Sequence, residues 1–360
     1  MSGSGVSLRY LKIDRFRCLT AVDFEPHPRQ NIIVGANGAG KTSVLETIFF
    51  LGRGRSFRPG QSATLIQSGA DEFTVFGEMR EREERRRVGV QFGRGGIRIH
   101  VNGEPGGATA ELAAAFPVQV IDLQVHELVQ GGPKGRRHFL DWGVFHVKHE
   151  FLPVWRRYRR ALRQRNTALR QGLSRQGIEV WEAELISAGT LIDEHRRAYL
   201  AEFQHRFESV SLALLGHVAT CTYRPGWAQD LDFKAALAGA RERDAAHGQT
   251  HVGPHRAELA LEVDGVAARH RLSRGQQKLL GISLVLAQSQ FVAERIHRDI
   301  ALLVDEPAAE LDEDHLARLI GVLSETEAQL FVTALDRGAL PIDSETQVFH
   351  VKHGVLSTLL

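Results

Sequence analysis

A glycine-rich loop near the start of the chain has the residue types and spacing that bind a nucleoside triphosphate. Residues 35–42 read Gly-Ala-Asn-Gly-Ala-Gly-Lys-Thr and match the pattern G-x-x-x-x-G-K-[ST] at every fixed position. Glycines let backbone N–H groups turn toward phosphate oxygens, the lysine reaches the β- and γ-phosphates, and the hydroxyl holds Mg²⁺. We therefore predict that ATP and Mg²⁺ bind here, on Gly35, Ala36, Asn37, Gly38, Ala39, Gly40, Lys41, Thr42 and Ser43.

Two adjacent acids, Asp305 and Glu306, follow the apolar run 302–304 near the other end of the chain. A carboxylate at the end of a buried strand holds Mg²⁺ directly or through water, and we predict that role for Asp305, together with Thr42. Glu306, one residue further on, is then placed to orient and polarise the attacking water as a general base. The predicted catalytic residues are Glu306, Asp305 and Lys41.

A third segment, Leu272-Ser-Arg-Gly-Gln-Gln277, lies where a helix is expected to begin. Hydroxyl and backbone N–H groups there form an anion site, although a plain N-cap explains Ser273 equally well. The segment resembles the LSGGQ signature of the ABC ATPase superfamily, and Leu311-Asp312 resembles the D-loop of those proteins. That resemblance implies an ATP-dependent homodimer, in which Ser273 and Gly275, with Gln276, bind the ATP of the partner subunit.

The elements around the phosphate loop are expected to be two strands and a helix. Residues 7–14 alternate apolar and polar side chains, and 31–34 form a short buried strand that leads into the loop. Residues 44–51 carry the apolar stripe of a helix, ended by Gly52 and Gly54.

The next part of the chain is rich in strand and turn signals. Several β-like segments lie between 73 and 101, with turns at 93–96 and 102–103, and 117–121 is a further strand. We expect a mixed sheet in this opening part. Gln124, just after its last strand, is a possible Q-loop residue of the ATPase superfamily, or equally a plain surface glutamine.

The composition changes near residue 130, and from 136 to 217 the pattern becomes helical. Large side chains recur at steps of three and four on both sides of a polar break at 174–177, which predicts a short antiparallel helical hairpin of two or three heptads per helix. These seam positions, aromatic ones included, are expected to be core: Trp155, Tyr158, Leu162, Arg165, Leu169 and Leu173, then Trp181, Leu185, Ala188, Ile192, His195 and Tyr199.

The rest of the chain returns to alternating strands and helices after a loop-rich stretch at 226–256. In order, these are a strand at 258–263, a helix at 273–294, a strand at 300–304, a helix from 312 and a strand at 330–333. Such an order implies a parallel sheet, to which strand 31–34 also belongs. The predicted fold class is α/β, an ABC/SMC-type P-loop ATPase head that is discontinuous, with an inserted helical, coiled-coil-like arm. The expected domains are 1–125 and 241–360, which form the ATPase lobe, and 126–240, which forms the arm.

Positive charge is concentrated in the helical arm. Between Lys134 and Arg175 twelve Lys and Arg face only Asp141 and Glu150, so this stretch carries +10 and the remainder −8 of a net +2. Such asymmetry predicts a polyanion-binding surface, with a solvated arginine-rich helix face as the plain alternative.

Composition points to a soluble cytoplasmic protein. Cys18 and Cys221 are too few for a disulfide scaffold or a zinc site. Residues 1–5 lack the features of a signal peptide, and no apolar run is expected to span a membrane.

Several separated segments resemble the bacterial RecF family of recombination mediators, over nearly the whole chain. They are 52–58, 136–146, 155–166 and 253–256. In addition, Arg15-Phe-Arg-Cys-Leu19 is similar to the opening of SMC and double-strand-break-repair ATPases, which implies that Arg17 lies near the nucleotide. The segment Asp305-Glu306-Pro307 departs from the Asp-Asp of many RecF proteins and is the transporter-like form.

The resemblance implies an ATP-dependent dimer with weak, DNA-stimulated ATPase activity. Such proteins bind double-stranded and gapped DNA and help RecO and RecR to load RecA in recombinational repair, replication and the SOS response. The candidate DNA contacts here are Arg53, Arg55, Arg58, Arg136, Arg137, Arg156, Arg157 and Arg160.

Other classes share part of this pattern. A transporter ATPase subunit has the same three motifs, but Thr333 stands where it would carry a histidine, and the charge of the arm favours DNA. A purely architectural SMC-like DNA clamp is a second alternative. A P-loop kinase fits least, because the signature segment would then have no use.

Overall fold

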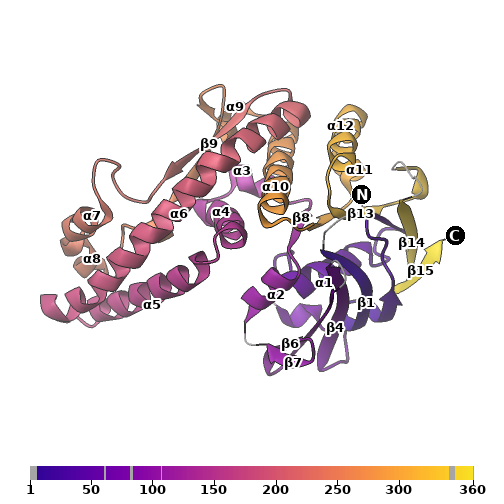
Figure 1. Cartoon of the computed structure of the whole chain (residues 1–360), viewed down its shortest axis with the longest axis horizontal. Coiled ribbons are helices and arrows are strands. Elements are labelled where there is room, and N and C mark those ends of the chain that lie inside the picture. The colour runs from indigo at the N-terminus through magenta and orange to yellow at the C-terminus, as the bar shows by residue number, and fades with distance from the viewer. Residues whose placement is uncertain (1–5, 61, 82–83, 107, 340–344, 360) are drawn as a thin grey trace. The chain divides into compact units, whose positions relative to one another are not determined.

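The chain forms two compact units. The computed structural model describes residues 6–60, 62–81, 84–106, 108–339 and 345–359. Unit 1 comprises residues 1–125 and 289–360, and unit 2 comprises 126–288 (Figure 1). Residues 241–288 thus group with the helical segment, and their assignment to the ATPase lobe stays a prediction.

A mainly parallel sheet organises unit 1. Its strand order is β15-β14-β3-β13-β12-β8, and every neighbouring pair is parallel except β14 with β15. The expected place of the phosphate-loop strand in this sheet is therefore confirmed, whereas the C-terminal hairpin β14–β15 was not expected. The strands are β3 (Gln30–Val34), β8 (Val118–Ile121), β12 (Ala301–Val304), β13 (Gln329–Ala334), β14 (Thr346–Lys352) and β15 (Val355–Leu359).

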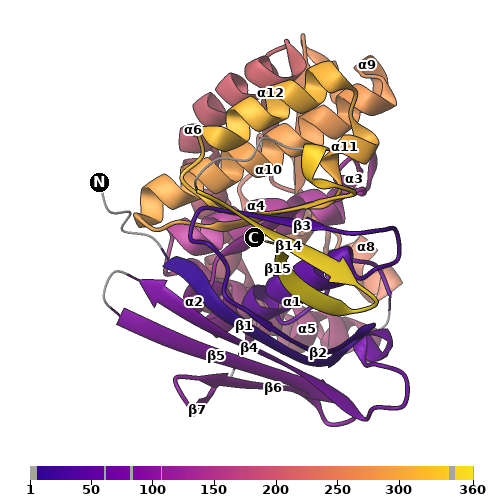
Figure 2. The same ribbon diagram turned by 90° about the vertical axis from the view of Figure 1, so that its right-hand side faces the viewer.

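A second, antiparallel sheet completes unit 1, so the expectation of one mixed sheet in the opening part is wrong. Its order is β2-β1-β4-β5-β6-β7, and Figure 2 shows these strands side by side. One face of each long strand is apolar, and tight turns such as Asn102-Gly103 join neighbours directly, which closes these strands into their own sheet. The strands are β1 (Val6–Phe16), β2 (Leu19–Phe24), β4 (Glu72–Glu81), β5 (Glu84–Gly93), β6 (Gly96–Val101) and β7 (Glu104–Gly106).

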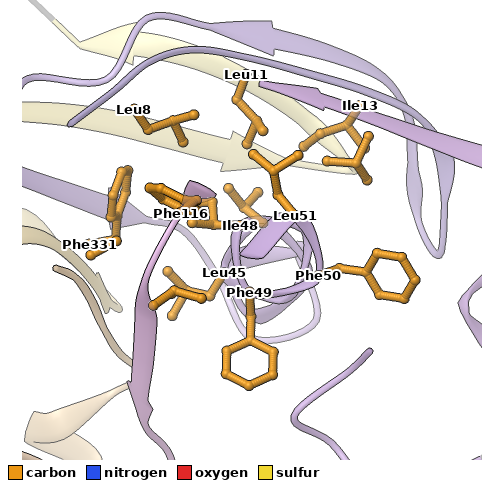
Figure 3. Packing of buried hydrophobic residues seen from close by; sticks show 14 of the residues in the cluster. Leu8, Leu11, Ile13, Leu45, Ile48, Phe49, Phe50, Leu51, Phe116 and Phe331 are labelled. Atoms are coloured by element: carbon orange, nitrogen blue, oxygen red, sulfur yellow. The ribbon is translucent and has the colours of Figure 1, made fainter. Parts of the chain in front are cut away.

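Helix α1 (Lys41–Arg53) lies between the two sheets and forms the centre of the core. It packs against β1, β4 and β5 of the antiparallel sheet and against β8 and β13 of the parallel one. Figure 3 shows its side chains pointing to several sides, with Leu8, Leu11 and Ile13 of β1 among their neighbours. Because every residue from Ser43 to Gly52 is buried, α1 is held from both faces. The helix ends at Gly54, which has a left-handed φ of 61°.

The predicted helical hairpin forms in unit 2. Helices α5 (Phe151–Arg170) and α6 (Arg175–Leu215) pack together, and α4 (Pro133–Val147) contacts both. The break lies slightly earlier than expected, because Ser174 caps α6 through the N–H of Gly177 at 3.4 Å. Helix α6 has 41 residues, so the expectation of a short second helix is wrong.

A buried cation replaces an apolar side chain at the hairpin seam. Arg165 is fully buried, and its guanidinium contacts Glu182 at 3.0 Å, Asp244 at 2.8 Å and Thr250 at 2.8 Å. The predicted seam residues Tyr158, Leu185, Ala188, Ile192 and Tyr199 are buried, and Trp155 is half-buried. The expectation that Leu173 is core is wrong, because α5 ends at Arg170 and Leu173 is exposed in the turn.

Short helices and a small sheet complete unit 2. The stretch expected to be loop-rich contains α7 (Phe233–Gly239) and α8 (Arg241–His247), because Asp232 and the apolar face of α7 stabilise local helix. The sheet has the order β11-β10-β9, and α10 follows it. The remaining elements are α3 (Glu127–Gln130), β9 (Ala219–Arg224), β10 (Glu258–Val263), β11 (Val266–Ala267), α9 (Ala268–Arg271) and α10 (Arg274–Ile296). The end of α10, from residue 289, belongs to unit 1.

Within the described part of the chain, α10 has the length and apolar composition of a membrane-spanning helix, contrary to expectation. Of its apolar window, 72% is buried inside the protein. A core helix has the same properties. Unit 1 also contains α2 (Thr109–Ala115), α11 (Pro307–Glu310) and α12 (Glu313–Ser324).

Candidate nucleotide site and basic helical face

The phosphate loop connects β3 directly to the N-terminus of α1. Gly38 and Gly40 have φ values of 76° and 116°, which side chains rarely adopt. A Cβ atom on Gly40 would also lie 3.0 Å from Sγ of Cys18. These glycines let the loop turn, so that the N–H groups of the loop and of the first helical turn of α1 point into the hollow of the loop. This is the geometry of an anion site.

Lys41 is almost fully buried below this loop. Its Nζ donates to the carbonyl oxygens of Gly35 at 2.7 Å and Ala36 at 3.2 Å. It also forms an ion pair with Oε1 of Glu306 at 2.9 Å. Two residues that lie far apart in the sequence and were both predicted to be catalytic are therefore in direct contact.

Asp305 lies beside Thr42 at the end of β12. Oγ1 of Thr42 is 3.1 Å from each carboxylate oxygen of Asp305. Burial raises the pKa of Asp305, and hydrogen bonds from Thr333 and Thr42 oppose that rise. A buried carboxylate next to a hydroxyl is an oxygen donor set of the kind that Mg²⁺ prefers, so these residues fit the predicted metal.

Thr333, at the end of the neighbouring strand β13, connects the two acids. Its hydroxyl donates to Oδ1 of Asp305 at 2.8 Å and accepts from the backbone N–H of Glu306 at 2.8 Å. The sequence prediction used Thr333 only as an argument against a transporter. A polar residue directly after the apolar run 330–332 was the available signal.

Glu306 has an unusual backbone for a glutamate. Its φ of 48° and ψ of 53° are left-handed, directly before Pro307 and the short helix α11. Such a conformation costs roughly 1–3 kcal/mol and is found preferentially at functional sites. The turn places the Glu306 carboxylate against Lys41 while its N–H contacts Thr333.

Arg17 forms an ion pair with Glu46. Its guanidinium forms two hydrogen bonds with Glu46 of α1, at 2.5 and 2.8 Å, and Glu46 is fully buried. Ser56 also bonds Glu46. The structure thus ties Arg17 to the helix that follows the phosphate loop, and its contact with a nucleotide stays a prediction. Gln124 is exposed in the turn after β8.

The signature segment begins α10 in unit 2. Ser273 and Gln276 cap the helix reciprocally: the N–H of Ser273 donates to Gln276 Oε1 at 3.0 Å, and the N–H of Gln276 donates to Ser273 Oγ at 3.3 Å. Ser273 and Gly275 are exposed. The observed hydrogen bonds are those of a plain N-cap. Contact with a partner's ATP stays a prediction.

The three candidate DNA contacts at the end of α1 and just after it differ in their surroundings. Burial, then repulsion from Arg55, lowers the pKa of Arg53 to about 9. Arg55 and Arg58 are exposed, and the charge of Arg58 favours the ionised form of Asp305. Arg58 therefore lies near the predicted metal site.

Arg136 corrects one DNA-contact expectation. It is buried, pairs with both oxygens of Glu258 at 2.8 and 2.9 Å, and donates to the carbonyl oxygen of Gly131 at 2.7 Å. These bonds use its guanidinium to hold unit 2 together. Arg137 is half-buried and donates to the carbonyl of Ala257 at 2.8 Å, and Arg157 pairs with Glu184.

One side of α5 nevertheless carries a row of exposed arginines, which we call the arginine face. Their spacing of three and four residues places them on one side of the helix. In the part of the chain that the structure describes, no acid lies within ion-pair distance of them. The arginine face consists of Arg156, Arg159, Arg160 and Arg163.

Comparisons with known proteins show which family the chain belongs to. The model of the family described as RecF/RecN/SMC N terminal domain matches residues 7–357. The DNA replication and repair protein RecF of Pseudomonas fluorescens strain Pf0-1 is 40% identical over 357 residues, which cover 97% of each chain. The protein of the same name from Shewanella loihica is 36% identical and covers 98% of this chain and 100% of its own.

Solved structures show the same fold. The recombination mediator protein RecF with ATP, of the RecFOR pathway, superposes with a TM-score of 0.90 at 23% identity, covering 100% of this chain and 99% of its own. The Smc head domain of Pyrococcus furiosus gives a TM-score of 0.60 at 15% identity, covering 98% and 96%. The ABC/SMC-type ATPase head predicted from the sequence is confirmed, and the chain belongs to the RecF family.

Proposed function

We propose that this chain is an ATP-dependent DNA-binding protein of recombinational repair and replication. The observation that carries the proposal is the meeting of Lys41, Thr42, Asp305 and Glu306 at the ends of β3 and β12. The names of the curated relatives support the assignment to DNA replication and repair. Family membership also favours this function over the transporter alternative.

The nucleotide chemistry follows from the contacts of Lys41. On ATP binding its ammonium exchanges the carboxylate of Glu306 and the loop carbonyls for phosphate oxygens. Glu306 is then free to orient a water molecule and to accept its proton. Thr42 and Asp305 would hold Mg²⁺, which would supply charge neutralisation at the phosphates. We expect weak ATPase activity that DNA stimulates.

The DNA side of the function rests on the arginine face. Arginines without acidic partners bind phosphate oxygens, and a row on one helix follows a sugar–phosphate backbone without reading its bases. We therefore propose that double-stranded and gapped DNA binds along α5, largely independently of sequence. Arg53, Arg55 and Arg58 are further candidates near the nucleotide.

A homodimer would join the two activities. Ser273, Gly275 and Gln276 would bind the ATP held by Lys41 and Thr42 of the partner subunit, with Arg17 and Gln124 near the nucleotide. RecR and RecO, acting with RecA in the cytoplasm and in the SOS response, are the proposed protein partners. An SMC-like clamp, which closes on ATP without a loading cycle, is the remaining alternative.

Sedimentation of the Glu306→Gln variant tests the proposal. The variant keeps Asp305 and Thr42 but loses the proton acceptor, so it should bind ATP, hydrolyse it far more slowly and accumulate as a dimer on gapped DNA. The unchanged protein with ADP, with ATP and with ATP plus gapped DNA serves as the control. A monomeric mass in every condition would refute the dimer. A Glu306→Gln variant that hydrolyses ATP as fast as the unchanged protein would refute the role of Glu306.

A further inference from the structure

Unit 2 contains a cavity of about 210 Å³ beside the arginine face. Its wall comes from the first turns of α4, from α5 and α6, and from residues 254–255. Arg159 lines this cavity and also belongs to the arginine face, so the two features are continuous. The side chains that decide its chemistry are Lys134, Arg137, Arg159, Trp155, Asp141 and Arg196.

Part of the wall is already neutral and fully bonded. Arg196 binds both oxygens of Asp141 at 2.8 and 3.0 Å and donates to the carbonyl of Pro254 at 2.8 Å. Burial lowers the pKa of His255 to about 4, so this ring is neutral near pH 7. Its Nδ1 lies 2.6 Å from the hydroxyl of Tyr158 and its Nε2 lies 3.1 Å from the carbonyl of Thr250. These groups shape the cavity but are occupied with each other.

Three other cations at the cavity, Lys134, Arg137 and Arg159, have no ion-pair partner within the described part of the chain. Among the described residues, no carboxylate lies within 4.0 Å of Lys134, Arg137 or Arg159. Arg159 stacks on Trp155, with its guanidinium carbon 4.8 Å from the ring centroid. Arg196 and Arg256 repel Arg137, whereas Glu258 and Asp141 attract it from beyond ion-pair distance, and Asp141 is already paired with Arg196. The cavity therefore has an excess of positive charge that an anion would relieve.

We propose that this cavity binds the terminal phosphate monoester of a DNA strand, which deepens the proposed function and rests on it. A monoester carries a charge near −2 at neutral pH, whereas an internal phosphodiester carries −1. A cluster of three cations around a confined space therefore favours a strand end over an internal phosphate. The continuity with Arg159 lets a strand that follows the arginine face reach the cavity with its end.

The test uses DNA whose only strand ends lie at a gap. A dumbbell closed by hairpin loops carries one gap, whose margin bears a 5′-phosphate, a 3′-phosphate or only hydroxyls, and a second dumbbell has no gap. Dissociation constants are measured by fluorescence anisotropy with ATP and Mg²⁺. We expect the protein to bind one of the two phosphorylated dumbbells about tenfold more tightly than the dumbbell whose gap bears only hydroxyls. This factor corresponds to ~1.4 kcal/mol. Lys134→Gln and Arg159→Gln should each reduce the ratio of the two dissociation constants to about one.

Arg163→Gln is the matched control, because Arg163 is an exposed arginine of the same helix that does not line the cavity. It should weaken binding of all dumbbells alike and keep the phosphate ratio. A ratio near one in the unchanged protein, with tight binding of the closed dumbbell, would overturn the inference and leave the proposed function intact. Failure to bind any dumbbell would refute both.

Free phosphate monoesters are the other source of the same chemistry. Deoxyribose 5-phosphate is therefore titrated into each complex. If it competes in the unchanged protein but not in Lys134→Gln, while the phosphate ratio is one, the cavity serves a free metabolite and the DNA assignment is wrong. Competition that removes only the preference for the phosphorylated gap supports the assignment.

Discussion

Replacing Thr333 by valine should shift the pH dependence of Mg²⁺–ATP binding. The hydroxyl is fully buried and donates to Oδ1 of Asp305 at 2.8 Å, so it stabilises the ionised carboxylate. Burial already raises the pKa of Asp305 above its ordinary value. Valine has nearly the same shape but no hydrogen to donate, and the pKa must therefore rise further.

The size of the shift follows from the lost bond. A hydrogen bond to a charged group contributes about 1.5–3 kcal/mol. Since one pKa unit corresponds to ~1.4 kcal/mol, we expect a rise of about one to two units. Asp305 must be ionised to hold Mg²⁺, so the variant binds poorly at low pH and recovers as pH rises. The backbone N–H of Glu306 also loses its acceptor, which costs roughly 1–3 kcal/mol of stability if no water replaces it.

Titration with a fluorescent ATP analogue at saturating Mg²⁺, from pH 5 to pH 9, measures this effect. The ratio of the dissociation constants of variant and unchanged protein cancels the titration of the nucleotide itself. That ratio should be largest at low pH and fall with increasing pH. Thr333→Ser keeps both hydrogen bonds and should give a ratio near one throughout. A ratio for Thr333→Val that does not change with pH would show that the hydroxyl does not control Asp305.

Two further predictions concern unit 2. Arg165→Met removes the cation between Glu182 and Asp244 and should destabilise the unit by about 3–5 kcal/mol, while Arg175→Met, in an exposed ion pair with Glu179, should change little. All four tryptophans lie between residues 142 and 227, so denaturant unfolding followed by their fluorescence reports on unit 2 alone; equal midpoints for both variants would contradict the buried network. Arg160→Gln should lower the slope of log affinity for DNA against log salt by about one, whereas Arg136→Gln, which acts within the protein, should leave that slope unchanged.

The nucleotide site was predictable because its residues follow local rules. A phosphate loop needs a strand before it and a helix after it, and adjacent acids after an apolar strand place Asp305 and Glu306 at the same sheet edge. Thr333 was not predicted as a site residue because its role depends on which strand lies beside β12. Strand order depends on tertiary packing and is absent from local patterns.

Local patterns were weaker in the helical unit. The periodicity predicted both helices of the hairpin, but it could not separate Arg165, which is buried among acids, from the exposed arginines of α5. The same limit applies to Arg136, whose partner Glu258 lies far away in the sequence. Charge counted along the chain thus overestimates the surface available to DNA, since part of it is paired inside the fold.

The strand order of the parallel sheet constrains how the chain folds during its synthesis. Strands β3 and β8 are made early, but β12 and β13, which lie between them, and β14, on the other side of β3, are made near the end. Until residue 352 has left the ribosome, at least one edge of β3 is unpaired, and the open edges and apolar faces of the early strands favour aggregation. The helical unit is complete while the nucleotide-binding unit still lacks its middle strands. We expect chaperones to bind the open strand edges during this interval.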